Sequence, residues 1–188
     1  MHEIVSWFNS ISIWNLPLAN SLIDFSLRCI ADPDDEVILP DPCFPTYSSV
    51  LKYTGIKPVY IALKSEHEYR MQPSDIANSI TSKTKAILIN SPHNPTGAVL
   101  RKKEVIQIAE IAKENDIYLI SDEVYFLMIF HSRHYSPRSL SGLIFVKIPM
   151  TCTMPDLLIP NQLQGECLAT VFCVPARTRN SSTTSLIC

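Results

Sequence analysis

Three polar side chains follow apolar segments of the chain, and their types are suited to binding a polar aromatic ring. Asn94 comes after the apolar segment 87–89, and Asp122 and Tyr125 come after a second apolar segment, 117–120. Ligands of open α/β sheets bind beyond the carboxyl ends of the strands, so we expect these side chains to converge on one crevice. A carboxylate can pair with a ring cation, while a phenol and an amide can bond a ring oxygen.

Alternating strand and helix patterns must position these residues. The segment 101–115 places Val105, Ile108, Ile111 and Ala112 on one side and its charges on the other, which predicts an amphipathic helix covering a sheet. Upstream, the patterns predict helices at 20–30 and 72–80, a loop leading into a helix over 43–53, and strands at 36–39 and 57–63. The charged segment 64–71 is interpreted as a solvated connection. This alternation favours an α/β fold with a mostly parallel sheet and flanking helices.

Composition narrows the class of protein. The chain has 188 residues, 46% hydrophobic and 18% charged, with a formal net charge of -2, which suits one globular domain with a real core. The charge balance gives no electrostatic reason to expect nucleic acid or an anionic membrane as a partner. No apolar run reaches 18 residues, and Glu3 stands where a signal peptide would be basic, so we expect a cytoplasmic location. The six cysteines form no C-x-x-C pair, which favours buried thiols and no metal site.

The motifs NSPHNPTG and SDEVY, separated by the amphipathic helix, resemble the class I/II (fold type I) aminotransferases that use pyridoxal phosphate. The resemblance spans 19–140 and includes DPDDEVILPDPCFPTY. It implies part of the large, cofactor-binding domain of such an enzyme, which transfers an amino group from an amino acid to a 2-oxo acid. It also implies pyridoxal 5′-phosphate as cofactor and a homodimer as a possible assembly.

The resemblance implies a role for each residue of the ring site. Asp122 would pair with the protonated pyridine nitrogen, and Tyr125 and Asn94 would hydrogen-bond the phenolic oxygen of the cofactor. Phe44 would lie against the ring face. Singly, each of these residue types is more often a turn former, a helix cap or a core residue, and only the spaced set points to a cofactor.

The same resemblance places the cofactor phosphate at the start of the first helix. The backbone amides of Ala19, Asn20 and Ser21 would bind it, as helix N-termini bind anions. Leu18 stands where the family usually has glycine. We interpret His93, inside the first motif, as a structural loop residue.

The lysine that carries the cofactor as a Schiff base in this family is not found in its usual S-x-x-K motif after Asp122. Lys147 is the only lysine beyond Lys113, and we interpret it as an ordinary strand-end residue. The composition changes near Gly142, which suggests a frameshifted or aberrantly spliced reading frame beyond it. We therefore expect an unmatched segment at 1–18, the partial domain at 19–140 and a poorly ordered tail at 141–188.

Three functions stay open on these grounds. The chain is an aminotransferase fragment with little activity alone, a non-catalytic fragment that binds cofactor or a partner, or a fold type I pyridoxal enzyme acting as a lyase or decarboxylase. The residues that hold the cofactor do not distinguish among these chemistries.

Overall fold

Helices and strands alternate through most of the chain, as the hydrophobic periodicity predicts. The computed structural model describes residues 19–129, 133–140, 144–147 and 169–173. The segment 1–18 and most of 141–188 lie outside the described residues, so the prediction of a poorly ordered tail stays a prediction.

In the part of the chain that the structure describes, six strands form one sheet in the order β2-β1-β3-β4-β6-β5. The strands are β1 Glu36–Asp41, β2 Lys57–Ala62, β3 Thr84–Asn90, β4 Tyr118–Asp122, β5 Ile144–Lys147 and β6 Ala169–Cys173. β2, β1, β3 and β4 are parallel to one another, whereas β6 is antiparallel to both β4 and β5. The predicted mostly parallel sheet is therefore confirmed.

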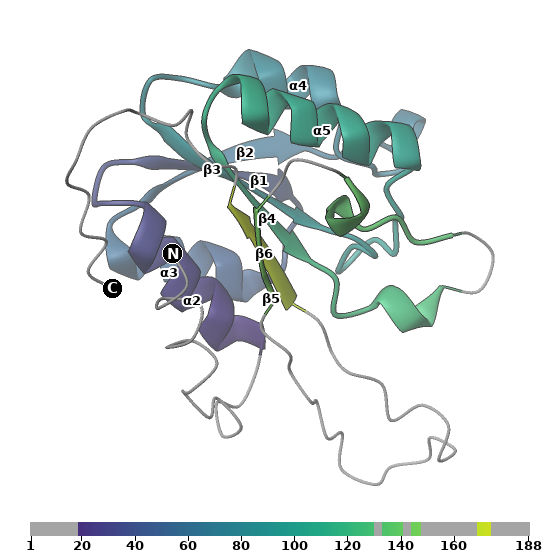
Figure 1. Cartoon of the computed structure of the whole chain (residues 1–188), viewed down its shortest axis with the longest axis horizontal. Coiled ribbons are helices and arrows are strands. Elements are labelled where there is room, and N and C mark those ends of the chain that lie inside the picture. The colour runs from purple at the N-terminus through teal and green to yellow at the C-terminus, as the bar shows by residue number, and fades with distance from the viewer. Residues whose placement is uncertain (1–18, 130–132, 141–143, 148–168, 174–188) are drawn as a thin grey trace, which may run out of the picture.

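Within the described residues, four α-helices cover the sheet, two on each face (Figure 1). They are α2 Ala19–Ile30, α3 Pro45–Thr54, α4 Pro73–Ser79 and α5 Lys102–Glu114, and the short 3₁₀ helices are η2 Ser65–His67, η3 Phe126–Met128 and η4 Pro137–Ser139. α2 and α3 pack on one face of the sheet, and α4 and α5 pack on the other. These elements match the predicted helices to within a few residues.

The two faces of the sheet follow from the alternation of side chains along each strand. In β4, Leu119 belongs to the core under α4 and α5, whereas Ile120 belongs to the core under α2 and α3. In β3, Ile87 and Leu88 divide in the same way. Both faces of these strands are buried, which explains why their sequences are continuous apolar runs.

The end of α3 shows how local sequence sets the element boundaries. Pro45 occupies the first turn of the helix, where its missing N–H is not needed. Gly55 closes the helix with φ of 79°, and a Cβ atom there would lie 3.3 Å from the Pro33 side chain. A left-handed conformation and a close neighbour together explain why glycine occupies this position.

The charged segment 64–71 differs from the sequence-based interpretation of a solvated connection. Arg70 and Met71 are both buried. The Arg70 guanidinium forms ion pairs with Glu104, at 2.9 Å, and with Glu68. The apolar part of the arginine is covered while its charge is paired, an outcome that charge counting along the sequence does not predict.

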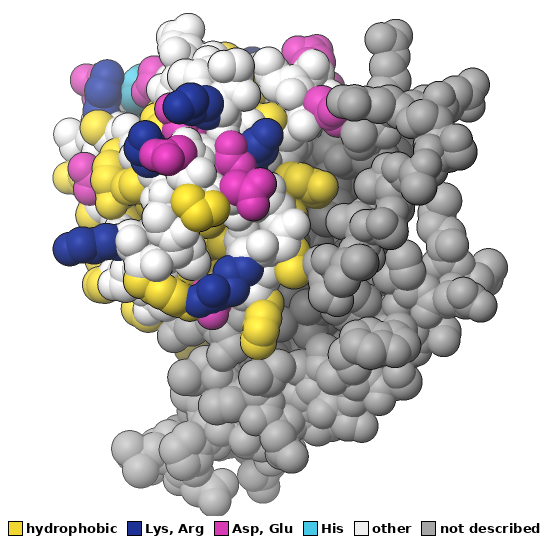
Figure 2. Space-filling view, turned by 90° about the vertical axis from the view of Figure 1, so that its left-hand side faces the viewer, with side chains coloured by type: hydrophobic (Ala, Val, Ile, Leu, Met, Phe, Trp, Pro, Cys, Tyr) yellow, Lys and Arg dark blue, Asp and Glu magenta, His cyan; other side chains and the backbone are white. Residues whose placement is uncertain are grey.

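The described surface carries charges of both signs. Figure 2 shows Lys and Arg side chains interspersed with Asp and Glu side chains on the face it displays. Within the described residues, no helix has the length and apolar character needed to cross a membrane.

Cys29 is exposed and Cys43 is partly buried, so the expectation of buried thiols is wrong for Cys29.

Candidate functional site

The site begins with the pairing of β3 and β4 at their carboxyl ends. Asn90 and Asp122 are directly opposite each other in the parallel register. Each lies two residues beyond a side chain of the α2/α3 core, Leu88 and Ile120 respectively, so both side chains are directed to that face. Both are buried. The sheet therefore presents an amide and a carboxylate together at its carboxyl edge.

Asp122 is held by one hydrogen bond from α3 and one from the turn that follows β4. The Tyr47 hydroxyl donates to Asp122 Oδ2 at 2.5 Å, and the Val124 N–H donates to Oδ1 at 3.1 Å. Burial raises the pKa of the Asp122 carboxyl group above its usual range, and these two hydrogen bonds oppose part of that rise. Each carboxylate oxygen has a second lone pair, so Asp122 can accept a further donor.

Tyr125 and Asn94 meet through a direct contact. The Asn94 amide, Nδ2, donates to the Tyr125 hydroxyl at 3.1 Å, across a sequence separation of 31 residues. Asn90 anchors this loop, because its Oδ1 accepts the Asn94 N–H at 2.7 Å and its Nδ2 donates to the Asp122 carbonyl at 3.1 Å. The structure thus brings together Asn94, Asp122 and Tyr125 at one end of the sheet.

Tyr47 and Asn90 are site residues that the sequence analysis missed. Tyr47 lies on the buried face of α3 and is 1% exposed, so periodicity alone assigns it to the core. Burial and the negative charge of Asp122 raise the pKa of Tyr47 far above its ordinary value, which keeps the phenol protonated as a donor. The sequence feature that could have indicated Tyr47 is its hydroxyl group, because a tyrosine hydroxyl buried in a core needs a hydrogen-bond partner.

Phe44 lies beside Tyr47, the side chain that donates a hydrogen bond to Asp122. It is the residue immediately before α3, and it is partly buried. Its ring contacts the Tyr47 ring edge to face, with centroids 5.7 Å apart and planes at 73°. Phe44 is thereby connected to Asp122 through a single side chain.

The start of α2 lies toward the same edge of the sheet. Ala19 and Asn20 are the first residues of this helix, which ends at Ile30 shortly before β1 begins. A helix of this length extends about 18 Å, close to the length of β1, so α2 runs back along the sheet toward the carboxyl ends of the strands. The side chains of Ala19 and Asn20, and the whole of Leu18, lie outside the described residues.

Lys147 is the last residue of β5, as expected of a strand-end lysine. Its backbone pairs with Thr170 in β6, and Thr170 pairs with Ser121 in β4. The Lys147 backbone therefore lies in the same row as Ser121, near the edge that carries Asp122. Its side chain lies outside the described residues.

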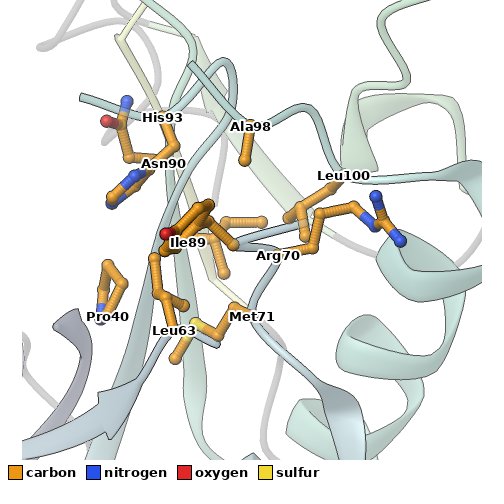
Figure 3. Close-up of a pocket in the computed structure, with 10 residues that line it drawn as sticks. Pro40, Leu63, Arg70, Met71, Ile89, Asn90, His93, Ala98 and Leu100 are labelled. Carbon is orange, nitrogen blue, oxygen red and sulfur yellow. The ribbon is translucent and has the colours of Figure 1, made fainter. Parts of the chain in front are cut away.

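A small cavity near this edge is not the ring site. Its lining includes Leu63, Met71, Ile89, Asn90 and His93 (Figure 3). Its volume is about 10 Å³, which is room for about one water molecule. Several of its apolar residues belong to the core under α4 and α5, the face opposite Asp122.

His93 has a structural environment, consistent with its interpretation as a loop residue. It is buried, and its Nδ1 atom lies 2.8 Å from the Thr96 hydroxyl. Burial lowers the pKa of His93, which favours the neutral ring. The following Gly97 has φ of 74°, a left-handed turn that suits glycine.

A parallel sheet with helices on both faces and a polar site at its carboxyl edge defines a ligand-binding α/β fold. The Aminotransferase class I and II family model matches residues 2–148, so the chain belongs to this family. Members of the family use pyridoxal phosphate. The match begins before Ala19 and ends beyond Leu140, the limits of the resemblance seen in the sequence.

Individual relatives agree with this assignment. An aspartate aminotransferase of Pyrococcus abyssi is 40% identical over 126 residues, which are 66% of this chain and 32% of the relative. An arginine–pyruvate transaminase of Pseudomonas aeruginosa is 39% identical over 117 residues, which are 62% of this chain and 30% of the relative.

Solved structures show the same fold. An alanine aminotransferase from Pyrococcus furiosus matches with a TM-score of 0.65 and 37% identity, covering 69% of this chain and 33% of that structure. The chain thus spans about a third of the length of the relatives that it matches.

Proposed function

We propose that the carboxyl edge of the sheet binds pyridoxal 5′-phosphate. Asp122 holds the pyridine nitrogen, Tyr125 and Asn94 hold the ring oxygen, and Phe44 covers the ring face. The observation that supports this proposal is the direct bond between Asn94 and Tyr125 beside a buried carboxylate. Three polar groups of complementary type gathered at one edge match the polar atoms of a single ring.

The donors and acceptors fit the cofactor. A protonated ring nitrogen is a donor, and Asp122 retains lone pairs beyond those used by Tyr47 and Val124. A ring oxygen is an acceptor, and the second hydrogen of the Asn94 amide and the Tyr125 hydroxyl are available to donate. The backbone amides of Ala19 and Asn20, at the start of α2, are proposed to bind the phosphate.

When bound, the cofactor supplies an electron sink for reactions at the α-carbon of an amino acid. The chain's own residues act on its charge and orientation. An ionised Asp122 keeps a proton on the ring nitrogen, and Tyr47 keeps Asp122 in place by donating to Oδ2. Phe44, whose ring is held edge to face against Tyr47, would cover one face of the bound ring and exclude water from it.

For the whole protein, we propose amino-group transfer between an amino acid and a 2-oxo acid in a cytoplasmic homodimer. Residues 19–140 are the proposed cofactor-binding part, between the segments 1–18 and 141–188. The second candidate is a non-catalytic fragment that binds the cofactor or a partner. The absence of an S-x-x-K motif after Asp122 in the sequence favours this candidate.

Equilibrium titration of the chain with pyridoxal 5′-phosphate tests the proposed site. We expect saturable binding, with affinity reduced roughly 10- to 150-fold in Asp122→Asn, because a charge-assisted hydrogen bond contributes about 1.5–3 kcal/mol. Asp116→Asn is the matched control, since Asp116 is exposed and asparagine tolerates its φ of 56°. Equal affinity in wild type and Asp122→Asn would refute the assignment.

Mass analysis after borohydride reduction separates the two candidate functions. A covalent adduct on one lysine identifies a residue that replaces the missing motif and favours a catalytic chain. Saturable binding without an adduct favours the non-catalytic fragment.

A further inference from the structure

A second buried polar cluster lies on the opposite side of β4 from Asp122. Its centre is Glu123, which is 5% exposed. Glu123 Oε1 accepts hydrogen bonds from Ser121, at 3.0 Å, and from Ser136, at 2.8 Å. His134 Nε2 lies 3.0 Å from Oε2. A single carboxylate therefore gathers three side chains from two separate parts of the chain.

The cluster has one hydrogen-bonding arrangement that satisfies its groups. A carboxylate only accepts, so both serine hydroxyls and His134 Nε2 must donate to it. The other ring nitrogen of His134, Nδ1, is buried without a hydrogen-bond partner among the described residues. A bare Nδ1 and a protonated Nε2 fit these surroundings, because a proton on Nδ1 would be a buried donor without an acceptor.

The cluster fastens the segment 133–140 to the end of β4. Tyr135 and Leu140 in this segment pack on the core under α4 and α5, while His134 and Ser136 bond Glu123. The segment is thus held by apolar contacts on one side and by a buried carboxylate on the other.

The turn that carries Tyr125 is held by hydrogen bonds to Asp122 and Glu123, made by the residues on either side of Tyr125. Asp122 Oδ1 accepts the Val124 N–H before Tyr125, and the Glu123 carbonyl accepts the Phe126 N–H after it, at 3.0 Å. The Phe126 ring also lies 6.1 Å from the His134 ring, centroid to centroid. Displacing His134 therefore removes a neighbour of the residue that follows Tyr125.

We propose that Glu123 is a positioning residue, which keeps the Tyr125 hydroxyl against Asn94 by clamping segment 133–140 onto the end of β4. Within the described residues, Glu123 forms no side-chain hydrogen bond with Asn94, Asp122 or Tyr125, and it acts on Asp122 through its charge, which helps to raise the pKa of Asp122. The proposal deepens the proposed function, because the Asn94–Tyr125 pair is the part of the site assigned to the ring oxygen.

Nuclear magnetic resonance of the free chain tests the clamp without any ligand. In Glu123→Gln we expect the Asn94 side-chain amide signals to shift and the Phe126 amide to exchange at least several-fold faster. Glu114→Gln, an exposed acid on α5, is the matched control and should change neither signal. Unchanged Asn94 signals in Glu123→Gln would overturn the proposal whether or not the chain binds cofactor.

The ratio of affinities for two related ligands tests the positioning role, because a general destabilisation of the fold weakens the binding of both ligands equally. We expect the wild type to bind pyridoxal 5′-phosphate about 3- to 10-fold more tightly than 3-deoxypyridoxal 5′-phosphate, which lacks the ring hydroxyl. In Glu123→Gln this preference should approach one. A parallel loss for both ligands, with the preference retained, contradicts the positioning role. If the wild type binds neither ligand, the proposed function is refuted, and the NMR experiment on the free chain then decides whether Glu123 positions Tyr125.

Ser136→Ala is the milder variant should Glu123→Gln unfold. It removes one donor to Oε1 and leaves Ser121 and His134 in place. We expect the same changes in the Asn94 signals and in ligand preference, at smaller amplitude. Wild-type behaviour of a folded Ser136→Ala on both readouts would count against the clamp.

Discussion

Asp122 and Glu123 are neighbours in sequence, yet their side chains belong to opposite faces of the sheet and to different kinds of site. Asp122 lies on the α2/α3 face, where Tyr47 and the Val124 backbone each donate one hydrogen bond and lone pairs remain. Glu123 lies in a closed cluster in which three side chains converge on it. The difference teaches that burial of a carboxylate alone does not mark a candidate ligand site, and that the donors already bound to it must be counted: two at Asp122 and three at Glu123.

If Glu123 serves the fold, its removal should have the largest effect on stability. Glu123→Ala leaves Ser121, Ser136 and His134 without their shared acceptor, and we expect a loss of about 3 kcal/mol in the free energy of unfolding. Urea denaturation measures the loss, with Glu114→Ala as the exposed control. A change no larger than that of the control would show that the closed cluster is not a stabilising element.

Tyr47→Phe should have an intermediate effect, because it removes the donor to Asp122 Oδ2 without opening a large cavity. We expect a loss of about 1–2 kcal/mol near neutral pH, the typical result of leaving a buried acceptor unpaired. The hydrogen bond from Tyr47 lowers the pKa of Asp122, so its loss should raise that pKa further. A ¹³C titration of the Asp122 carboxyl group in both proteins measures the shift, and a lower pKa in the variant would contradict this prediction.

Asp122→Asn should have the smallest effect, and it should be stabilising in the free chain. The pKa of Asp122 is raised in the folded state, so the contribution of this group to stability is present at low pH and is lost as pH rises through the folded pKa. Asparagine avoids the buried charge, and we expect a gain of up to about 1 kcal/mol at pH 7 that disappears toward pH 4.

Unfolding free energies of wild type and Asp122→Asn across this pH range test the sign. A variant that is less stable at pH 7 than at pH 4, relative to wild type, would show that Asp122 stabilises the free fold. Asp122 and Glu123 would then no longer differ in kind, since both carboxylates would act as structural residues.

Much of the fold follows from the sequence, because hydrophobic periodicity is a local property. The stripe formed by Val105, Ile108 and Ala112 predicted α5, and all three residues are buried. The segment 64–71 is where this reasoning failed. Arg70 is buried because Glu68 and Glu104 pair with it, and one of these partners lies 34 residues away.

The candidate site was predictable only in part. Residue type and position after a strand predicted that Asn94, Asp122 and Tyr125 lie close together, because parallel strands present their carboxyl ends at one edge. Tyr47 was missed, since its helical spacing is that of a core residue and its partner is 75 residues away. Glu123 was missed because its partners His134 and Ser136 lie in a segment without a periodic pattern.

The sequence by itself determined the alternation of strands and helices, the family to which the chain belongs and the polar residues at the strand ends. The tertiary structure decided which partners each polar residue has. The alternation of side chains along β4 directs Asp122 and Glu123 to opposite faces, and the elements packed on each face supply different donors. Asp122 accepts two hydrogen bonds and keeps the larger capacity for a further donor, whereas Glu123 is bound by three side chains that hold segment 133–140 to the end of β4.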